Sequence, residues 1–174
     1  WVINLSMSII QYKFNTCFGK FSILELDKQV IYIGLPNCKN GRIMDWCRKQ
    51  LKTDNINKVE KGQTDAAGQI IEFLNGKIKS FTFPYKLITT AFHGKALKSV
   101  ADIPYGHTKS YKDIAVEIQS PKAVRAVGSA NASNPLPIVI PCHRVISHDG
   151  SLGGYGGGLD LKMKLLELEG CMER

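Results

Sequence analysis

The sequence has no long apolar run, and this absence excludes a protein that spans a membrane with helices. No uninterrupted apolar stretch among the 174 residues approaches the roughly 20 residues that a membrane-spanning helix needs. Segment 1–7 is too short for a signal peptide and lacks the basic start of one. We therefore expect a protein that binds no membrane and lies in the cytoplasm, or in the nucleus if its source is a eukaryote.

Paired cysteines are also missing. The five cysteines are odd in number and follow no paired spacing, which does not predict a disulfide framework. They are Cys17, Cys38, Cys47, Cys142 and Cys171. Scattered thiols of this kind are typical of a reducing compartment. All four histidines follow residue 90, so the first half does not support a zinc site. The sequence predicts no metal and no cofactor.

The net charge of +8 suits a polyanionic partner such as nucleic acid. It is spread over both halves of the chain. Residues 1–85 carry 12 Lys/Arg and 7 Asp/Glu, and residues 86–174 carry 11 and 8. A solvated basic surface explains this spread as well as a nucleic-acid interface does. The charge alone therefore favours nucleic-acid binding only weakly.

The pattern of elements predicts an α+β fold that divides into residues 1–85 and 86–174. In the first part, short apolar runs separated by turn residues indicate strands, and apolar spacing of three to four indicates helices. The expected strands are Ile9–Phe14, Lys20–Leu26, Val30–Leu35 and Phe81–Phe83, and the expected helices are Arg42–Leu51 and Asp65–Leu74. This part shows no catalytic constellation.

The second part begins with an expected helix at Ala91–Ala101, and two shorter helices follow it. Ser110 and Asp113 form the pattern of a capping box at the start of one helix. Ser120 as N-cap and Pro121 as first helical residue predict the start of the next. Two short helices joined by a tight turn resemble a helix-turn-helix.

The last of these helices is rich in small residues. Ala123, Ala126 and Gly128 leave Arg125 as the single large polar side chain in its first turns. Small residues let a helix lie close to a groove of nucleic acid, and they equally permit close packing against another helix. The sequence of this helix leaves both interpretations open.

A thiol and an imidazole follow a proline-framed apolar run in the segment 137–145. Ile138–Ile140 reads as a short buried strand that Pro141 ends, and Cys142 and His143 come next. The ended strand would hold Cys142 in place, and His143 could take its proton. This matters because the thiolate is the nucleophile and a free thiol, with a pKa of about 8.5, is mostly protonated at neutral pH. A buried structural cysteine beside a surface histidine is the alternative.

A glycine-rich loop follows at 150–158, with Tyr155 as its only aromatic residue. Backbone without side chains lets a flat ligand approach closely, and Tyr155 offers a stacking face. Residues 159–168 then predict a helix that Gly170 ends. Glu169 stands at the end of that helix, where the helix dipole disfavours a negative charge. It is therefore either solvated or paired with a cation such as an imidazolium.

Several motifs occur together in one order across residues 88–171. They are Ser110-Tyr111, the segment 123–128, Asn134-Pro135, the segment Pro141–Val145, Tyr155 with Gly156-Gly157, and Glu169-Gly170. Together they resemble the O6-alkylguanine-DNA alkyltransferases. The resemblance implies a ribonuclease-H-like domain at 1–85 and a winged helix-turn-helix domain at 86–174. It also implies repair of O6-alkylguanine, and of O4-alkylthymine, by a single-turnover transferase.

The resemblance implies a role for each site residue. Cys142 would accept the alkyl group, with His143 activating it through a water, Glu169 orienting His143, and Asn134 shaping the site. Tyr111 would donate to the guanine ring. The carbonyls of Cys142 and Val145 would accept from the exocyclic amine, and the Gly156 N–H would face the guanine oxygen. Tyr155 and Pro137 would complete the base site.

The resemblance further implies a monomer that binds double-stranded DNA in the minor groove, largely without sequence preference. The residues facing the DNA would be Ser110, Ala123, Arg125, Ala126 and Gly128. The damaged nucleotide would be flipped out of the duplex, because its reacting atom is inaccessible there. Arg125 would fill the space that the nucleotide leaves.

The chain departs from the family pattern at two places. Other members often carry a side chain where Gly156 stands and an apolar residue where Asn131 stands, and we expect neither difference to touch the chemistry. Two other functions fit parts of the sequence. One is a DNA-binding regulator in which Cys142 is incidental, and the other is a Cys–His hydrolase whose oxyanion hole the glycine loop supplies. Stoichiometry distinguishes the three, because only an alkyltransferase stops after one event.

Overall fold

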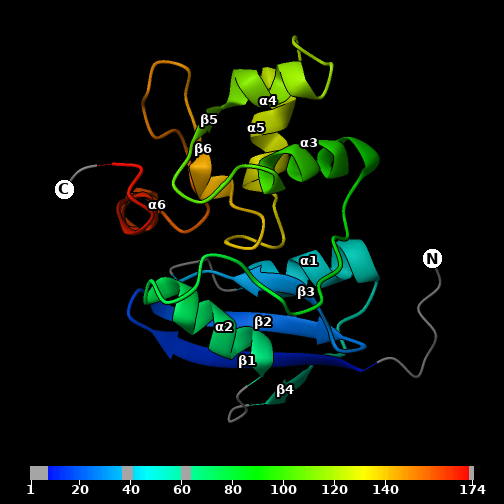
Figure 1. Ribbon diagram of the computed structural model, residues 1–174. Coiled ribbons are helices and arrows are strands. Elements are labelled where there is room, and N and C mark those ends of the chain that lie inside the picture. The colour runs from blue at the N-terminus through cyan, green and yellow to red at the C-terminus, as the bar shows by residue number, and fades with distance from the viewer. Residues whose placement is uncertain (1–7, 37–40, 60–63, 173–174) are drawn as a thin grey trace. The chain divides into compact units, whose positions relative to one another are not determined.

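The structure is a computed structural model that describes residues 8–36, 41–59 and 64–172 (Figure 1). The chain forms two compact units, residues 1–88 and 89–174, and the predicted boundary at residue 85 lies three residues before the observed one. Cys38 and segment 1–7 lie outside the described residues. The described part contains no helix long and apolar enough to cross a membrane.

The first unit is built on a four-stranded sheet with the order β3-β2-β1-β4. β1 (Ile9–Thr16), β2 (Gly19–Leu26) and β3 (Gln29–Gly34) form an antiparallel meander. The short β4 (Asn57–Val59), which the sequence did not predict, pairs parallel with β1. Its three residues carry no alternating apolar pattern that could mark them as a strand.

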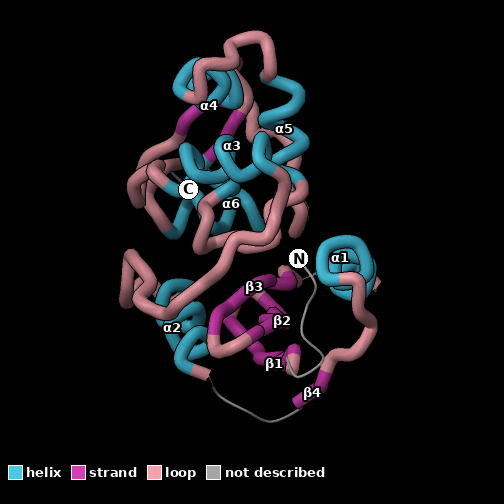
Figure 2. The backbone as a smooth tube through the Cα atoms, turned by 90° about the vertical axis from the view of Figure 1, so that its right-hand side faces the viewer, coloured by secondary structure: helices cyan, strands magenta, loops and turns pink. Residues whose placement is uncertain are grey.

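Two helices cover this sheet, and both have the predicted bounds. α1 (Arg42–Leu51) and α2 (Asp65–Leu74) lie on opposite sides of the strands (Figure 2). Cys47 and Leu51 of α1 join a buried cluster with Leu24 and Leu26 of β2. Because β2 is covered on both faces, the consecutive residues Phe21–Leu24 are all buried.

The strand predicted at Phe81–Phe83 is wrong. The Thr82 N–H donates to Oε1 of Gln69 at 2.8 Å, so a side chain of α2 takes the place of a neighbouring strand. The chain meets the sheet later, where Tyr85 forms an isolated bridge with Val30. The carbonyl of Pro84 accepts from Val30 N–H at 3.0 Å. Pro84 itself has no N–H to offer a ladder.

The second unit combines four helices with a two-stranded parallel sheet. α3 has the predicted bounds, and the capping box of Ser110 and Asp113 is confirmed. The elements are α3 (Ala91–Ala101), β5 (Lys109–Ser110), α4 (Tyr111–Glu117), α5 (Val124–Ala132), the 3-10 turn η1 (Cys142–Arg144), β6 (Val145–Ile146) and α6 (Leu159–Leu168). α3, α4 and α5 contact one another. β6 follows η1 directly in the chain, and it pairs with β5. The predicted end of α6 is confirmed, with Glu169 as C-cap and Gly170 at a φ of 74°.

The predicted start of the next helix at Ser120 and Pro121 is wrong. α5 begins three residues later, at Val124, with Ala123 in the N-cap position. Gln119 adopts a left-handed φ of 58°, and the Ser120 hydroxyl bonds back to the carbonyl of Ile118. Ser120 thus closes the preceding turn and is not available to cap α5. The Ala123 N–H donates to Ser120 O at 2.8 Å, which completes a second turn before the helix.

The strand predicted at Ile138–Ile140 is also wrong, because this segment is a tight turn. Ile138 has a φ of 76°, a conformation that a β-branched residue adopts at a cost of about 1–3 kcal/mol. The Ile140 N–H donates to Leu136 O at 2.8 Å, and Pro137 pairs with Ile140 in an isolated bridge. The prolines at 137 and 141 lack the N–H groups that a strand would need on both sides. The turn, and not a strand, leads into Cys142.

Candidate active site

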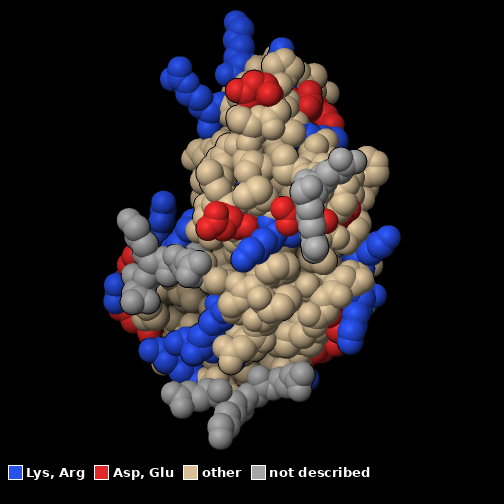
Figure 3. Space-filling model, turned by 90° about the vertical axis from the view of Figure 1, so that its left-hand side faces the viewer, with Lys and Arg blue, Asp and Glu red and all other residues tan. Residues whose placement is uncertain are grey.

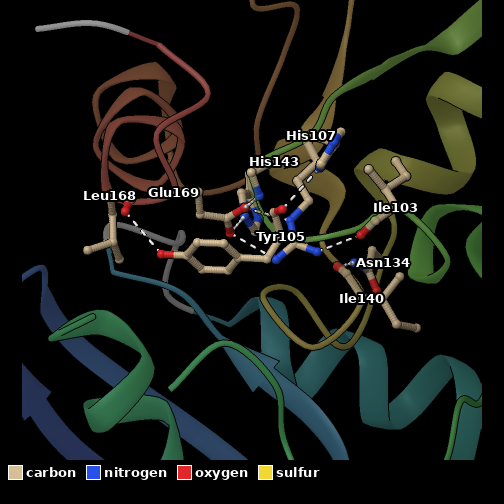
Figure 4. Close-up of polar contacts among 10 residues, drawn as sticks. Ile103, Tyr105, His107, Asn134, Ile140, His143, Leu168 and Glu169 are labelled. Atoms are coloured by element: carbon tan, nitrogen blue, oxygen red, sulfur yellow. Dashed lines mark hydrogen bonds and ion pairs between the residues drawn. The ribbon is translucent and has the colours of Figure 1, made fainter. Parts of the chain in front are cut away.

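Cys142 is held by the turn that precedes it. Its N–H donates to Ile140 O at 2.7 Å, and it opens the 3-10 turn η1 with only 4% of its surface exposed. Asn134 supports the same turn from the other side. Its Nδ2 donates to Ile140 O at 2.8 Å, and its Oδ1 accepts from Leu136 N–H at 2.9 Å (Figure 4). The backbone at Cys142 is therefore fixed by hydrogen bonds within a buried site.

His143 and Glu169 form a hydrogen-bonded pair beside Cys142. Nε2 of His143 lies 2.7 Å from Oε1 of Glu169, and neither side chain is exposed. The histidine comes from η1 and the glutamate from the C-cap of α6, so the pair joins segments 26 residues apart (Figure 4). The Gly106 N–H adds a bond of 3.3 Å to Oε2.

Arg144 is a member of this cluster that the sequence did not predict. Its Nε donates to Oε2 of Glu169 at 2.7 Å and its second terminal nitrogen to Oε1 at 3.0 Å, which makes a two-pronged ion pair. Its other terminal nitrogen donates to Ile103 O at 2.6 Å, and the guanidinium lies 5.7 Å from the centre of the Tyr105 ring. Its place beside His143 in the motif was the available signal, because a buried carboxylate needs a cation.

These contacts set the protonation states of the pair. Burial raises the pKa of Glu169, but the hydrogen bonds from His143 and Arg144 outweigh it and lower the pKa to about 2. Burial lowers the pKa of His143, against the opposing effect of Glu169, so the imidazole is neutral. An ionised carboxylate only accepts, so Nε2 of His143 carries the proton. The buried Nδ1 has no hydrogen-bond partner within the described residues and remains a base.

Comparison with known proteins assigns the family. Residues 91–171 match the family model described as the DNA-binding domain of 6-O-methylguanine DNA methyltransferase. The inducible methylated-DNA–protein-cysteine methyltransferase of Bacillus subtilis is 40% identical over 149 residues, which cover 86% of this chain and 83% of that protein. This chain belongs to the same family.

Solved structures agree with that assignment. The crystal structure of Mycobacterium tuberculosis OGT in complex with DNA matches with a TM-score of 0.81 and 30% identity, over 92% of each chain. The O6-methylguanine-DNA methyltransferase of Pyrococcus kodakaraensis matches with a TM-score of 0.68 and 28% identity, over 93% of this chain and 99% of that one. The predicted family and enzyme class, and the α+β fold, are thereby confirmed.

A buried lysine in this methyltransferase escaped the sequence analysis. Lys162 of α6 is fully buried, and its Nζ donates to Val145 O at 2.6 Å and to Leu152 O. Burial lowers its pKa to about 8 and outweighs the opposing effect of Cys142. It ties β6 to the first residues of the glycine loop. Its helical spacing among leucines gave no sign that it points inward.

Two of the residues predicted to bind the base, Tyr155 and Tyr111, lie near His143 and Cys142. Tyr155 stands edge-on to His143, with ring centres 6.5 Å apart. Tyr111 opens α4, and burial raises its pKa, partly offset by the Asn131 side chain. A side chain at Gly153 would meet the Tyr111 ring and hydroxyl at 3.2 Å, so the glycine lets the loop lie against Tyr111. Pro137 and Val145 are buried, whereas Gly156 is exposed.

The residues predicted to face DNA lie mostly on the surface of α5. Arg125 and Ala126 are exposed, and Ala123 and Gly128 are partly exposed. Ser110 is 6% exposed, and its hydroxyl is engaged with Asp113 in the capping box. Basic and acidic side chains both appear on each unit in the face drawn in Figure 3. No group of three metal-ligating side chains occurs within the described residues.

Proposed function

We propose that this methyltransferase repairs duplex DNA by moving the alkyl group of O6-alkylguanine onto Sγ of its own Cys142. The observation that carries the proposal is a buried Cys142 followed by a neutral His143. Nε2 of this histidine is hydrogen-bonded to Glu169. An ionised partner on Nε2 leaves Nδ1 as the base, which is the arrangement that activates a nucleophile. Arg144 fixes that partner in its ionised state.

The chemical step would be a single displacement. A water carries the thiol proton to Nδ1 of His143, the thiolate attacks the alkyl carbon, and the carbon–oxygen bond breaks with its electron pair going to the base. Tyr111 gives its proton to the ring as negative charge develops there and takes one back from water, and His143 returns the thiol proton to water. The base therefore leaves as neutral guanine. The product on Cys142 is a thioether, which is a poor leaving group, so the reaction is irreversible and each chain acts once. O4-alkylthymine presents the same alkyl–oxygen bond.

The same geometry supports the DNA complex that we propose. Cys142 is 4% exposed, and the reacting atom of a base is inaccessible within the stack, so the nucleotide must be flipped out. The small exposed residues of α5 suit close, sequence-independent docking in the minor groove, with Arg125 filling the vacated space. In this proposal α4 and α5 form the helix-turn-helix of a winged domain at 86–174. The sheet and helices of 1–85 form a ribonuclease-H-like support, and the protein acts as a monomer.

The test is intact-mass analysis after incubation with a duplex that carries one O6-methylguanine. The wild type should gain the mass of one methyl group in place of hydrogen. Cys142→Ser should gain nothing and bind the duplex with nearly unchanged affinity. Cys17→Ser is the matched control, because Cys17 is an exposed thiol of the first unit, and it should react like the wild type. An adduct on Cys142→Ser would show that the nucleophile lies elsewhere.

A further inference from the structure

Asn131 reaches the reacting residue, contrary to the expectation that it does not touch the chemistry. It lies on α5 with 7% of its surface exposed, and its Nδ2 donates to the carbonyl oxygen of Cys142 at 3.1 Å. The side chain also lies beside Tyr111, whose pKa it lowers against the larger raising effect of burial. Sequence alone could not show this, because the contact joins a helix to a turn 11 residues further on.

The carbonyl oxygen of Cys142 has a second donor. The Val145 N–H bonds to it as the cap of η1. A carbonyl oxygen has two lone pairs, so Asn131 and Val145 together use its full capacity. The carbonyl of Val145 is partly used as well, because the buried Lys162 donates to it at 2.6 Å. Both main-chain acceptors at the base site are therefore already bonded within the protein.

We propose that Asn131 is a specificity-determining residue that removes the Cys142 carbonyl from substrate recognition. The inference rests on the proposed function, and it replaces the expectation from the family resemblance that this carbonyl accepts from the exocyclic amine of guanine. If the amine displaced Asn131, a buried amide would lose its partner, which would offset the new bond. The 2-amino group then contributes little to transfer. The enzyme accepts alkylated bases without this group, which include O6-alkylhypoxanthine and O4-alkylthymine.

The test compares two duplexes that differ only in the 2-amino group of the damaged base. One carries O6-methylguanine and the other O6-methylhypoxanthine, and single-turnover transfer rates are measured on both. The wild type should show rates within about threefold of each other. Asn131→Leu keeps a similar branched shape and frees the carbonyl, so the ratio should rise about fivefold, the net worth of one hydrogen bond. The ratio is insensitive to the fraction of folded protein, because both substrates meet the same sample.

Ser133→Ala is the matched control, since Ser133 caps the exposed end of the same helix and bonds to Ser129 O. Its substrate ratio should equal that of the wild type. A wild-type preference of about tenfold or more for O6-methylguanine would overturn the inference, as would an unchanged ratio in an active Asn131→Leu variant. If the Asn131→Leu variant does not fold, Asn131→Ala is measured in its place. If neither variant is active, the ratio of the two wild-type rates alone tests the inference. Failure of the wild type on both duplexes would instead overturn the proposed function, and the inference with it.

Discussion

At the residue scale, the buried carboxylate of Glu169 organises the site. It sits at the C-terminal end of α6, where the helix dipole opposes a negative charge. Arg144, His143 and the Gly106 N–H all donate to it. The interactions with His143 and Arg144 hold its pKa at about 2 despite burial. Of the two alternatives for this carboxylate, solvation or a cationic partner, the structure shows the second, and the full cation is Arg144. The neutral His143 is thus free to act as a base.

Replacing the charge of Glu169 should slow transfer without abolishing it. In Glu169→Gln the amide cannot stabilise a protonated His143, so a higher pH is needed to form the thiolate. The rising limb of the single-turnover pH–rate profile should move to higher pH. Glu167→Gln, on the same helix, is the control and should keep the wild-type profile. An unshifted profile in Glu169→Gln would count against a relay from Glu169 through His143 to Cys142.

The chemistry-bearing residues were only partly predictable from the sequence. Cys142, His143 and Glu169 stand out because the local motif and an unfavourable helix-end charge mark them. Arg144, Lys162 and Asn131 do not, because their roles depend on which way each side chain points and on what lies across the fold. A lysine among leucines reads as a solvated helix position until the structure shows Nζ bonded to buried carbonyls.

At the element scale, predictions held where a local interaction decides the structure. The capping box of Ser110 and Asp113 sets the start of α4 within four residues, and the sequence shows it directly. The start of α5 depends instead on the left-handed conformation of Gln119, which no local pattern signals. The turn at Ile138 is similar, because a β-branched run between prolines favours a strand until tertiary packing holds it in a strained turn.

The position of Arg125 on α5 yields a prediction about base flipping. Arg125→Ala should weaken repair in duplex DNA more than transfer from a free alkylated base. Flipping costs a few kcal/mol. Losing the residue that fills the gap should make the free energy of flipping about 1–2 kcal/mol less favourable, which lowers the population of the flipped state. A free base needs no flipping and should be spared. The measurement is a pair of single-turnover rates, one on each substrate.

Lys122→Ala is the control for Arg125→Ala, because Lys122 is an exposed cation in the turn before α5. It removes the same charge without removing a side chain from the helix. Its effect should be small and confined to duplex affinity. Equal losses on both substrates in Arg125→Ala would assign Arg125 to the reaction pocket or to folding.

At the scale of the whole molecule, the buried cluster should make stability depend on acid. The pKa of Glu169 is about 2 in the folded protein and about 4.3 when unfolded, so its contribution is present above about pH 4.3 and lost towards pH 2. That contribution is on the order of 3 kcal/mol. Burial also lowers the pKa of His143 below its unfolded value, so acid begins to destabilise the protein below about pH 6.5.

The measurement is the free energy of unfolding by urea across this acid range. The wild type should lose stability steadily as the pH falls, and Glu169→Gln should lose less between about pH 4 and 2. Parallel curves for the two proteins would show that Glu169 does not carry the acid sensitivity.

Alkylation of Cys142 should destabilise the protein. The thiol is 4% exposed, between the Asn134 turn and the His143–Glu169 pair, so added carbon atoms meet a packed site. Such small-to-large changes cost about 1–3 kcal/mol. For a chain of this size the melting temperature should fall by about 2–8 °C, and further for larger alkyl groups. Thermal melts before and after complete reaction measure this, and Cys142→Ser treated in the same way should not change. A melting temperature that stays constant or rises would place Cys142 in an open pocket.

The most direct test of the account is the number of methyl groups that each chain can remove. The protein is mixed with an excess of duplex carrying O6-methylguanine, and the repaired duplex is counted until the reaction stops. The account predicts one repaired base per chain, with peptide mass mapping placing the methyl group on Cys142. Continued turnover would indicate a hydrolase, no repair would leave a DNA-binding protein, and an adduct on another residue would contradict the proposed site.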